Sequence, residues 1–301
     1  MDYRKEALPK VTIKAMNRLF HLFGDSARWI SLVSWSAIIV ALATALAPLA
    51  FILVVSFSEY HALGGGDGLI AEWLDDRNVN AMGNSLAVGF GVAVLLTVIS
   101  ILAALCFRWC NLTGHSTIYM LSILPLTVPD YVFGVAGRVM FDPSVGLFAE
   151  WLPDSLLFDR TSALLMVVAI TILKWLPLMI VIADAAIFAL GSPIFYQTMV
   201  DFTRFRRAVG LVFLPQLGKA TALIASLGFL IGFRQHELAY ELTSSGAGFD
   251  AEMWSNRNYR VIFEFAGVAR AAADGLLALG VLFVPIRLIH MATSWYLSNE
   301  E

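Results

Sequence analysis

Six long apolar runs constrain this chain more than any other feature. Each is close to or longer than the roughly 20 residues that cross a bilayer as a helix. They cover residues 29–57, 84–107, 116–141, 161–190, 216–233 and 268–297. Only 14% of the 301 residues are charged, whereas a soluble domain carries about 25%. The sequence therefore predicts an all-α, polytopic membrane protein with about six transmembrane helices.

The distribution of Lys and Arg predicts the orientation of these helices, because cytoplasmic loops are enriched in both. If the N-terminus is cytoplasmic, 12 of the 20 basic residues fall on that side and 6 on the other, while Arg138 and Lys174 lie inside the runs. We therefore expect both termini in the cytoplasm. Residues 1–28 form a basic amphipathic segment, which lies on the inner leaflet or is a solvated lead-in helix. The spans occupy 29–297, and 298–301 form a short tail. We expect no cleavable signal peptide.

A basic amphipathic segment, residues 194–219, separates the fourth and fifth runs. Its apolar side chains recur at helical spacing, which places them on one face of a helix. These side chains are Phe195, Met199, Phe202, Phe205 and Val209, and the opposite face carries Gln197, Asp201, Arg204 and Arg207. Such a segment in a cytoplasmic loop is offered either to the lipid surface or to a partner subunit.

The third and fourth runs contain ionisable side chains, which are costly in a bilayer and normally face a cavity, an interface or one another. Pro125, Pro129, Gly134 and Gly137 also interrupt the third run, and the freed backbone groups need new partners. The candidates for a translocation path are Asp130, Tyr131, Arg138, Lys174 and Asp184. Alternatively, the two aspartates are solvated near span ends, and Arg138 and Lys174 snorkel or pair internally.

Catalytic and metal-binding patterns are not legible. Gly218-Lys219-Ala220 lacks the upstream glycine and the hydroxyl residue of a phosphate-binding loop. The five histidines are scattered, without metal-ligand spacing. We expect Cys106 and Cys110 to be packing residues or reduced thiols, Asn84 or Ser85 to cap the second span, and residues 234–267 to form a long outer loop that gates, docks a partner or is plain surface. We predict no catalytic residue, metal or cofactor.

Three stretches resemble the membrane-spanning permeases of type I ABC importers. Asn84-Ser85 is similar to the Asn-Thr that often begins the permease core, and Leu124–Gly137 looks like the Pro-rich third span. Residues 196–215 stand where the family has its cytoplasmic coupling loop. Leu214-Pro215 matches the closing Leu-Pro, and Asp201 the acidic residue before the glycine, while Tyr196 and Phe202 replace the family's Glu and Gly. The closest likeness is to the branch that moves polyamines, ferric iron, thiamine or related solutes.

The resemblance implies a type I ABC importer permease fold and a non-enzymatic subunit that forms the path for a small solute. The loop at 194–215, within a cytoplasmic loop over 191–215, would seat in a groove of an ATPase. Phe202 and Phe205 would be its apolar knobs, Asp201, Arg204 and Arg206 its polar contacts, and Pro215 the start of the next span. The implied partners are a dimer of cytoplasmic ABC ATPases, a second and different permease, an external solute-binding protein and lipid, but no nucleic acid. The implied location is the bacterial inner membrane.

Three other hypotheses stay open at this point. The amphipathic segment could instead lie on anionic lipid, with its arginines near the headgroups. The chain could be an ATP-independent six-span carrier or channel, although carriers often contain inverted repeats and no clear match links the two halves. It could also be a membrane scaffold, which would have no need for Pro-broken spans with buried charge.

Overall fold

The computed structural model describes residues 35–36, 38–44, 46–56, 73–110, 123–144, 146–151, 153, 156–191, 197–198, 207, 209–213, 216–244, 249–265 and 267–298. The chain divides into two units, Met1–Val55 and Ser56–Glu301. An apolar helix over Ile38–Ser56 belongs almost entirely to the first unit, and it is long and apolar enough to cross a membrane. The predicted amphipathic segment over 1–28 lies outside the described residues.

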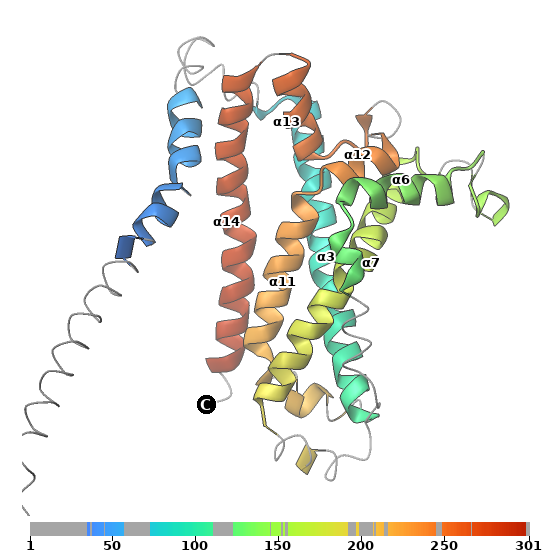
Figure 1. Cartoon of the computed structure of the whole chain (residues 1–301), viewed down its shortest axis with the longest axis vertical. Helices are drawn as coiled ribbons and strands as arrows, with labels where there is room; N and C mark the ends of the chain where they lie inside the picture. Colours follow the sequence, from blue (N-terminus) through green and yellow to red (C-terminus); the bar gives the residue numbers. More distant parts are fainter. Residues whose placement is uncertain are drawn as a thin grey trace, which may run out of the picture. The chain divides into compact units, whose positions relative to one another are not determined.

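The second unit is built around four helices (Figure 1). They are α3 (Asp76–Trp109), α7 (Arg160–Ala189), α11 (Gly218–Phe233) and α14 (Val268–Ser298). Of these, α3, α7 and the Val268–Met291 part of α14 are also long and apolar enough to cross a membrane, whereas α11 has only 16 residues. Within the described residues the predicted spans 161–190, 216–233 and 268–297 correspond closely to helices. We call the end of this bundle that holds the N-termini of α3 and α7 the upper end.

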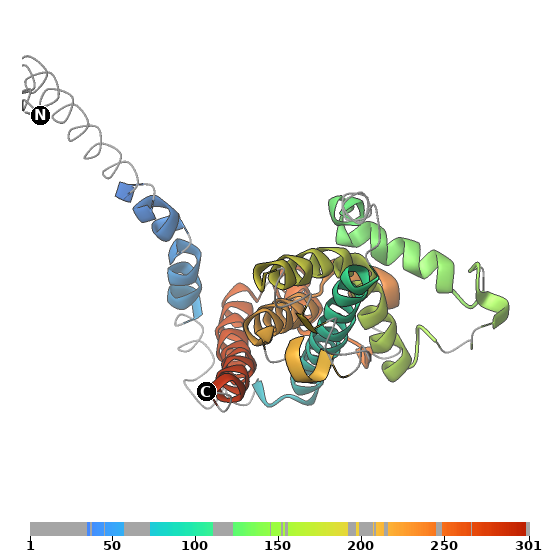
Figure 2. The same cartoon turned by 90° about the horizontal axis from the view of Figure 1, so that it is seen from below.

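Shorter elements surround these helices. They are α5 (Leu124–Thr127), α6 (Asp130–Phe141), α12 (Glu237–Thr243), α13 (Trp254–Phe263), the 3-10 turn η1 (Ala149–Trp151) and the π-helical turn η2 (Val209–Phe213). Two expectations need correction. The described part of the third run is two helices rather than one, and α6 leads away from the bundle (Figure 2). The stretch 234–267 is also no simple loop, because α12 and α13 occupy much of it.

Small residues let α3 and α11 approach closely. A Cβ added at Gly232 would lie 2.9 Å from the Cα of Gly89, and one added at Gly228 would lie 3.1 Å from the Cα of Ala93. Each helix therefore presents two small residues four positions apart, which is the pattern that allows backbones to pack tightly in membranes. The α7 helix begins differently, with the carboxylate of Asp159 accepting the N–H groups of Thr161 and Ser162 at 3.1 and 3.2 Å.

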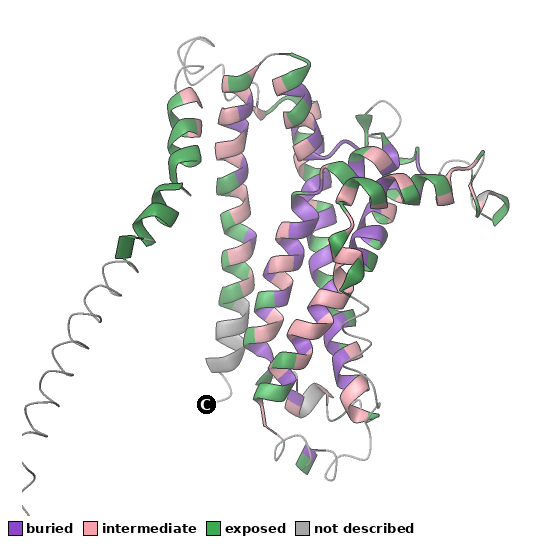
Figure 3. Ribbon diagram, in the orientation of Figure 1, coloured by how far each residue is buried: buried purple, intermediate pink, exposed green. Residues whose placement is uncertain are grey.

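The bundle buries one face of each helix and leaves apolar side chains on the other (Figure 3). A buried cluster runs through α3, α7 and α11 and includes Leu96, Met179 and Ile224. Large apolar side chains such as Leu165 and Phe283 are 61% and 69% exposed. An apolar outside fits a hydrocarbon environment, because lipid tails solvate Leu and Phe as well as a protein core does. The chain is a membrane protein.

Candidate functional site

The break between α5 and α6 is held by Lys174. Val128 precedes Pro129 and is extended, with φ −82° and ψ 127°, because a proline disfavours the helical region for the residue before it. This break leaves the Val128 carbonyl outside a helix. The Lys174 ammonium donates to that carbonyl at 2.8 Å and pairs with the Asp130 carboxylate at 2.6 Å. Lys174 is only 4% exposed, so these two contacts compensate for burying its charge.

Lys174 lies halfway along a candidate span. It is 14 residues from the start of α7 (174 − 160) and 15 from its end (189 − 174). At 1.5 Å per residue it is about 21 Å from the upper end of α7. Its ammonium also lies 5.3 Å from the centroid of the Phe133 ring, within the range of a cation–π contact. Of the two alternatives to a path role, snorkelling and internal pairing, the structure has Lys174 paired internally, with Asp130 as its partner.

A second break separates α11 from α12. Gly232, near the end of α11, packs on Gly89, which lies 13 residues (89 − 76) into α3, or about 20 Å from its upper end. The chain turns at Arg234–His236 and enters α12. Close packing joins the two breaks, because a Cβ added at Gly134 of α6 would lie 2.8 Å from the Leu238 carbonyl of α12. Non-helical backbone at such depth is tolerated only against protein or a polar cavity.

A pocket of about 280 Å³ lies where the two breaks meet α7. Its lining residues are Asp130, Trp175, Ile231, Arg234, Gln235, His236 and Glu237. The indole N–H of Trp175 is buried and has no hydrogen-bond partner within the described part of the chain. The imidazole Nδ1 of His236 lies 2.6 Å from the Asn256 side-chain oxygen of α13. The pocket is thus polar, partly unsatisfied and framed by two helix breaks.

The structure brings only part of the predicted translocation set together. Asp130 lines the pocket and Lys174 holds Asp130, whereas Tyr131 is 51% exposed. Arg138 is exposed on α6 and donates to the Ser244 hydroxyl at 2.7 Å. At the lower end, Asp184 forms an ion pair with Arg108 of α3, including a 3.0 Å hydrogen bond from the guanidinium to Oδ2. The alternative in which Asp184 is simply solvated is wrong, since it is paired.

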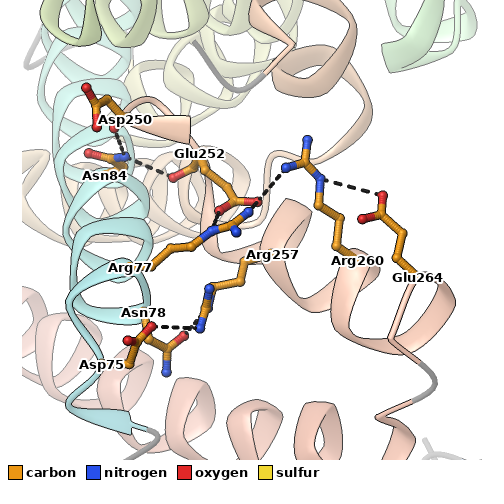
Figure 4. A network of polar contacts seen from close by, with 9 residues as sticks. All are labelled: Asp75, Arg77, Asn78, Asn84, Asp250, Glu252, Arg257, Arg260 and Glu264. Carbon is orange, nitrogen blue, oxygen red and sulfur yellow. Dashed lines mark hydrogen bonds and ion pairs between the residues drawn. The ribbon is translucent and has the colours of Figure 1, made fainter. Parts of the chain in front are cut away.

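A separate polar network near the upper end fixes the segment before α13 (Figure 4). Glu252 is 1% exposed, and its two carboxylate oxygens accept from Arg77 of α3 at 2.8 and 3.1 Å. Arg260 of α13 also lies 3.2 Å from this carboxylate. The two guanidiniums lie 4.2 and 4.3 Å from the Phe249 ring centroid. Both oxygens of Glu252 are thus engaged, and the segment is fastened to α3 and α13 together.

The pair Asn84-Ser85 belongs to this same fastening. The Asn84 amide donates to the carbonyls of Asp250 and Glu252 at 2.8 and 2.9 Å, and its oxygen accepts from Arg160 at 3.1 Å. The Ser85 hydroxyl accepts the Trp254 N–H at 2.8 Å. The expectation that these residues cap the second span is wrong, because α3 begins at Asp76 and both are buried within it. They are anchors for a distant segment.

The predicted coupling residues lie outside the described residues. These are Asp201, Phe202, Arg204, Phe205, Arg206 and Pro215. The turn η2, which lies between Arg206 and Pro215, is described, and its last residue, Phe213, is fully buried. Phe213 belongs to the same buried cluster as Leu105 of α3 and Ile187 of α7. The C-terminal part of the predicted loop is therefore anchored in the core at the lower end.

Sequence reasoning missed several residues of these two regions. Trp175, Arg234, Gln235, His236 and Glu237 were not singled out as parts of a path, and Glu252 was not noticed. No sequence signal marks Trp175, because neighbouring residues of a helix do not share a face and Lys174 therefore does not identify it. Arg234 was assigned to the outer side, yet α11 ends about 20 Å below the start of α3.

Comparison with solved structures assigns the architecture. The chain matches a crystal structure of a bacterial alginate ABC transporter in complex with an alginate pentasaccharide-bound periplasmic protein, with a TM-score of 0.66 and 18% identity. The match covers 93% of this chain and 96% of that chain. The chain has the fold of an ABC importer permease. A second match, to a bacterial ABC transporter involved in the import of the acidic polysaccharide alginate, has a TM-score of 0.62 at 17% identity and covers 91% and 98% of the two chains.

Sequence comparison adds no narrower assignment. No protein-family model matches the chain, and no curated protein sequence matches it. The permease fold therefore rests on three-dimensional likeness over nearly the whole chain. This agrees with the resemblance seen in the residues, which lay in the arrangement of features more than in identity.

Proposed function

We propose that this chain is the membrane-spanning permease subunit of an ABC importer and forms part of the path for a small solute. The observation that carries the proposal is the shared fold over 93% of the chain. The pocket at the two helix breaks is consistent with a solute path, because non-helical backbone at membrane depth is tolerated where it lines protein or a polar cavity. The chain itself does not hydrolyse ATP, since it has no phosphate-binding loop.

In this proposal the solute path includes the pocket. Asp130 lines the path there, and Lys174 holds Asp130 in place. Tyr131, Arg138 and Asp184 stay candidates for other parts of the path. Asp184 would act at the lower end, where its ion pair with Arg108 ties α7 to α3. Breaking and remaking such a contact is one way in which two packed helices can alternate between states.

The coupling loop over 194–215 binds a cytoplasmic ATPase dimer and is displaced when that dimer changes conformation. Phe202 and Phe205 are its apolar knobs, with Asp201, Arg204 and Arg206 around them and Pro215 at the start of the next span. Anchoring of Phe213 in the core supports this role. A displacement of the loop would be passed to α3 and α7 through packed side chains, which resist deformation.

The remaining parts of the assembly follow from this role. An external solute-binding protein delivers the solute, as the periplasmic protein named with the alginate transporter suggests. A second permease, a different chain, completes the path, and the complex sits in the bacterial inner membrane with both termini cytoplasmic. The solute belongs to the polyamine, iron or thiamine group or, by analogy with the structural neighbours, is a saccharide. The alternative is an ATP-independent six-span carrier or channel.

The substitution Phe205→Asp tests the coupling proposal. We expect the ATPase to dissociate while the membrane domain stays folded, because a charge replaces an apolar knob in the groove. The measurement is the amount of ATPase that co-purifies with the tagged chain. Phe263→Asp is the matched control, since Phe263 is 70% exposed on α13 and far in sequence from the loop. Wild-type recovery of ATPase with the Phe205→Asp chain would overturn the docking role.

A further inference from the structure

The pocket at the helix breaks contains charged groups that other residues do not neutralise. Among the described residues, neither Arg234 nor Glu237 takes part in an ion pair. Asp130 uses Oδ1 for Lys174, which leaves Oδ2 as an acceptor. The Trp175 indole N–H is a buried donor without a partner. A cavity with unengaged donors and acceptors on its wall is prepared for a polar ligand.

The formal charges around the pocket balance. Arg234 and Lys174 are cations, whereas Asp130 and Glu237 are anions. A solute with several positive charges would meet no excess of acid, and a strongly anionic solute would meet no excess of base. Arg234 and Glu237 are exposed, so either solute would meet hydrated groups whose charges already balance, and neither would gain a net electrostatic attraction. The balance therefore favours a solute unit without net charge.

The arrangement of donors and acceptors suits hydroxyl groups. A hydroxyl donates one hydrogen bond and accepts others, so neighbouring hydroxyls match a wall on which carboxylates stand beside N–H groups. Asp130 and Glu237 supply the carboxylates, and Arg234 supplies N–H groups. The Trp175 indole also provides an apolar face. A volume of about 280 Å³ exceeds the roughly 150 Å³ cavity that holds benzene, so one six-membered ring with substituents fits.

We propose that this pocket is a solute subsite that binds one uncharged, hydroxyl-rich ring, such as a neutral monosaccharide unit. Trp175, Arg234 and Glu237 contact the ring, and the Lys174–Asp130 pair keeps an acceptor oriented toward it. This inference rests on the proposed function, because a solute-binding subsite halfway along the spans has a function only if the chain transports the solute across the membrane. The proposal also distinguishes between the two groups of solutes named above, because a pocket with balanced charge disfavours a polyamine and suits a sugar.

Protection of introduced cysteines from a small thiol reagent tests the proposal. Cys106 and Cys110, both exposed, are first replaced by Ser. Gln235→Cys and His236→Cys, which line the pocket without contacting the ring in this proposal, are then made singly in the full complex. Labelling rates are measured with glucose, mannose or galactose, with the corresponding uronates, and with spermidine. Leu147→Cys is the control, because Leu147 is 79% exposed and outside the pocket.

We expect at least one neutral hexose to slow labelling at position 235 or 236 several-fold, at lower concentrations than any uronate or spermidine, and to leave position 147 unaffected. Stronger protection by a uronate or by spermidine would overturn the assignment of an uncharged ring. Absence of protection, or absence of labelling at both pocket positions, would overturn the subsite. Co-purification of the ATPase is scored in the same samples, so failure of the subsite is distinguishable from failure of the permease role.

Discussion

The two polar regions of the second unit are built on opposite principles. At the upper end, Glu252 is 1% exposed and both of its oxygens are engaged by Arg77 and Arg260. Halfway down, the Lys174–Asp130 pair adjoins a pocket in which Trp175 has an unpartnered N–H. Satisfied buried networks make a structure rigid. Buried polar atoms without a partner among the described residues occur in both regions, Asn258 Oδ1 in α13 and Trp175 Nε1 in α7, but the second region adjoins the pocket. We therefore infer that the first region stabilises the fold and propose that the second serves transport.

The largest expected effect comes from Glu252→Gln. The change leaves the guanidiniums of Arg77 and Arg260 without their anion, and breaking a buried pair costs about 3 kcal/mol at the lower end of its usual range, because the Arg77 side chain is 38% exposed. Thermal stability of the detergent-purified protein is the measurement. Glu264→Gln, which removes a 54% exposed carboxylate 3.8 Å from Arg260, is the control and costs under about 1 kcal/mol. Equal losses of thermal stability in the Glu252→Gln and Glu264→Gln variants would contradict the stabilising role of the buried Glu252 carboxylate.

Asn84→Ala comes next, with an expected loss of about 1–2 kcal/mol. The amide bonds to the carbonyls of Asp250 and Glu252, and its removal leaves buried acceptors unpaired. The same thermal measurement applies, together with faster proteolysis near residue 250 as the segment before α13 is released. A stable variant with an unchanged proteolysis pattern would contradict the anchoring role.

Lys174→Ala is expected to cost about 1 kcal/mol in stability and most of the transport activity. Removing one partner of a buried ion pair costs about 3–5 kcal/mol when the other charge stays buried. The cost is lower here because Asp130 is 26% exposed and can hydrate through the pocket. The comparison is between uptake in proteoliposomes and yield of folded protein. Lys219→Ala, at an exposed lysine of α11, should keep both. Loss of folded Lys174→Ala protein would place Lys174 with the stabilising region instead.

Trp175→Phe has the smallest expected effect on stability, under about 0.5 kcal/mol, because it removes an N–H that has no partner. Its effect should fall on the solute: the concentration for half-maximal uptake rises several-fold while the maximal rate changes little. Trp254→Phe is unsuitable as a control because Trp254 is only 4% exposed, so Trp151→Phe at an 81% exposed position is used. An unchanged uptake curve would remove Trp175 from the path.

Much of the helical framework could be predicted from the sequence. Residues 161–190 and 216–233 correspond to α7 and α11 within two residues at each end, because uninterrupted apolar runs define helices that cross a membrane. Pro125 and Pro129 indicate an irregular backbone in the third run, but they do not predict its division into α5 and α6 or the place of the break. Backbone geometry at Val128 and the reach of Lys174 from another helix decide that place.

The contacts that define both polar regions could not be predicted. Glu252 meets Arg77 across 175 residues of sequence, and Asn84 meets Glu252 across 168. Periodicity describes local structure, whereas these pairs depend on how the helices pack. Asn84 was read as a cap because a polar residue at the edge of an apolar run usually begins a helix. The polar residues 76–81 that precede Asn84 are nevertheless helical. Arg257 of α13 donates hydrogen bonds to Asn78 and Asp75 at the start of this helix.

The central claim is that this chain works as the permease of an ATP-driven importer. Its most direct test is purification of the tagged chain in mild detergent, followed by identification of stoichiometric partners by mass spectrometry. The account predicts a nucleotide-binding ABC ATPase in amounts equal to the permease subunits, together with a second, different permease. Recovery of a lone homo-oligomer without an ATPase, even after cross-linking, would contradict it and favour the carrier or channel.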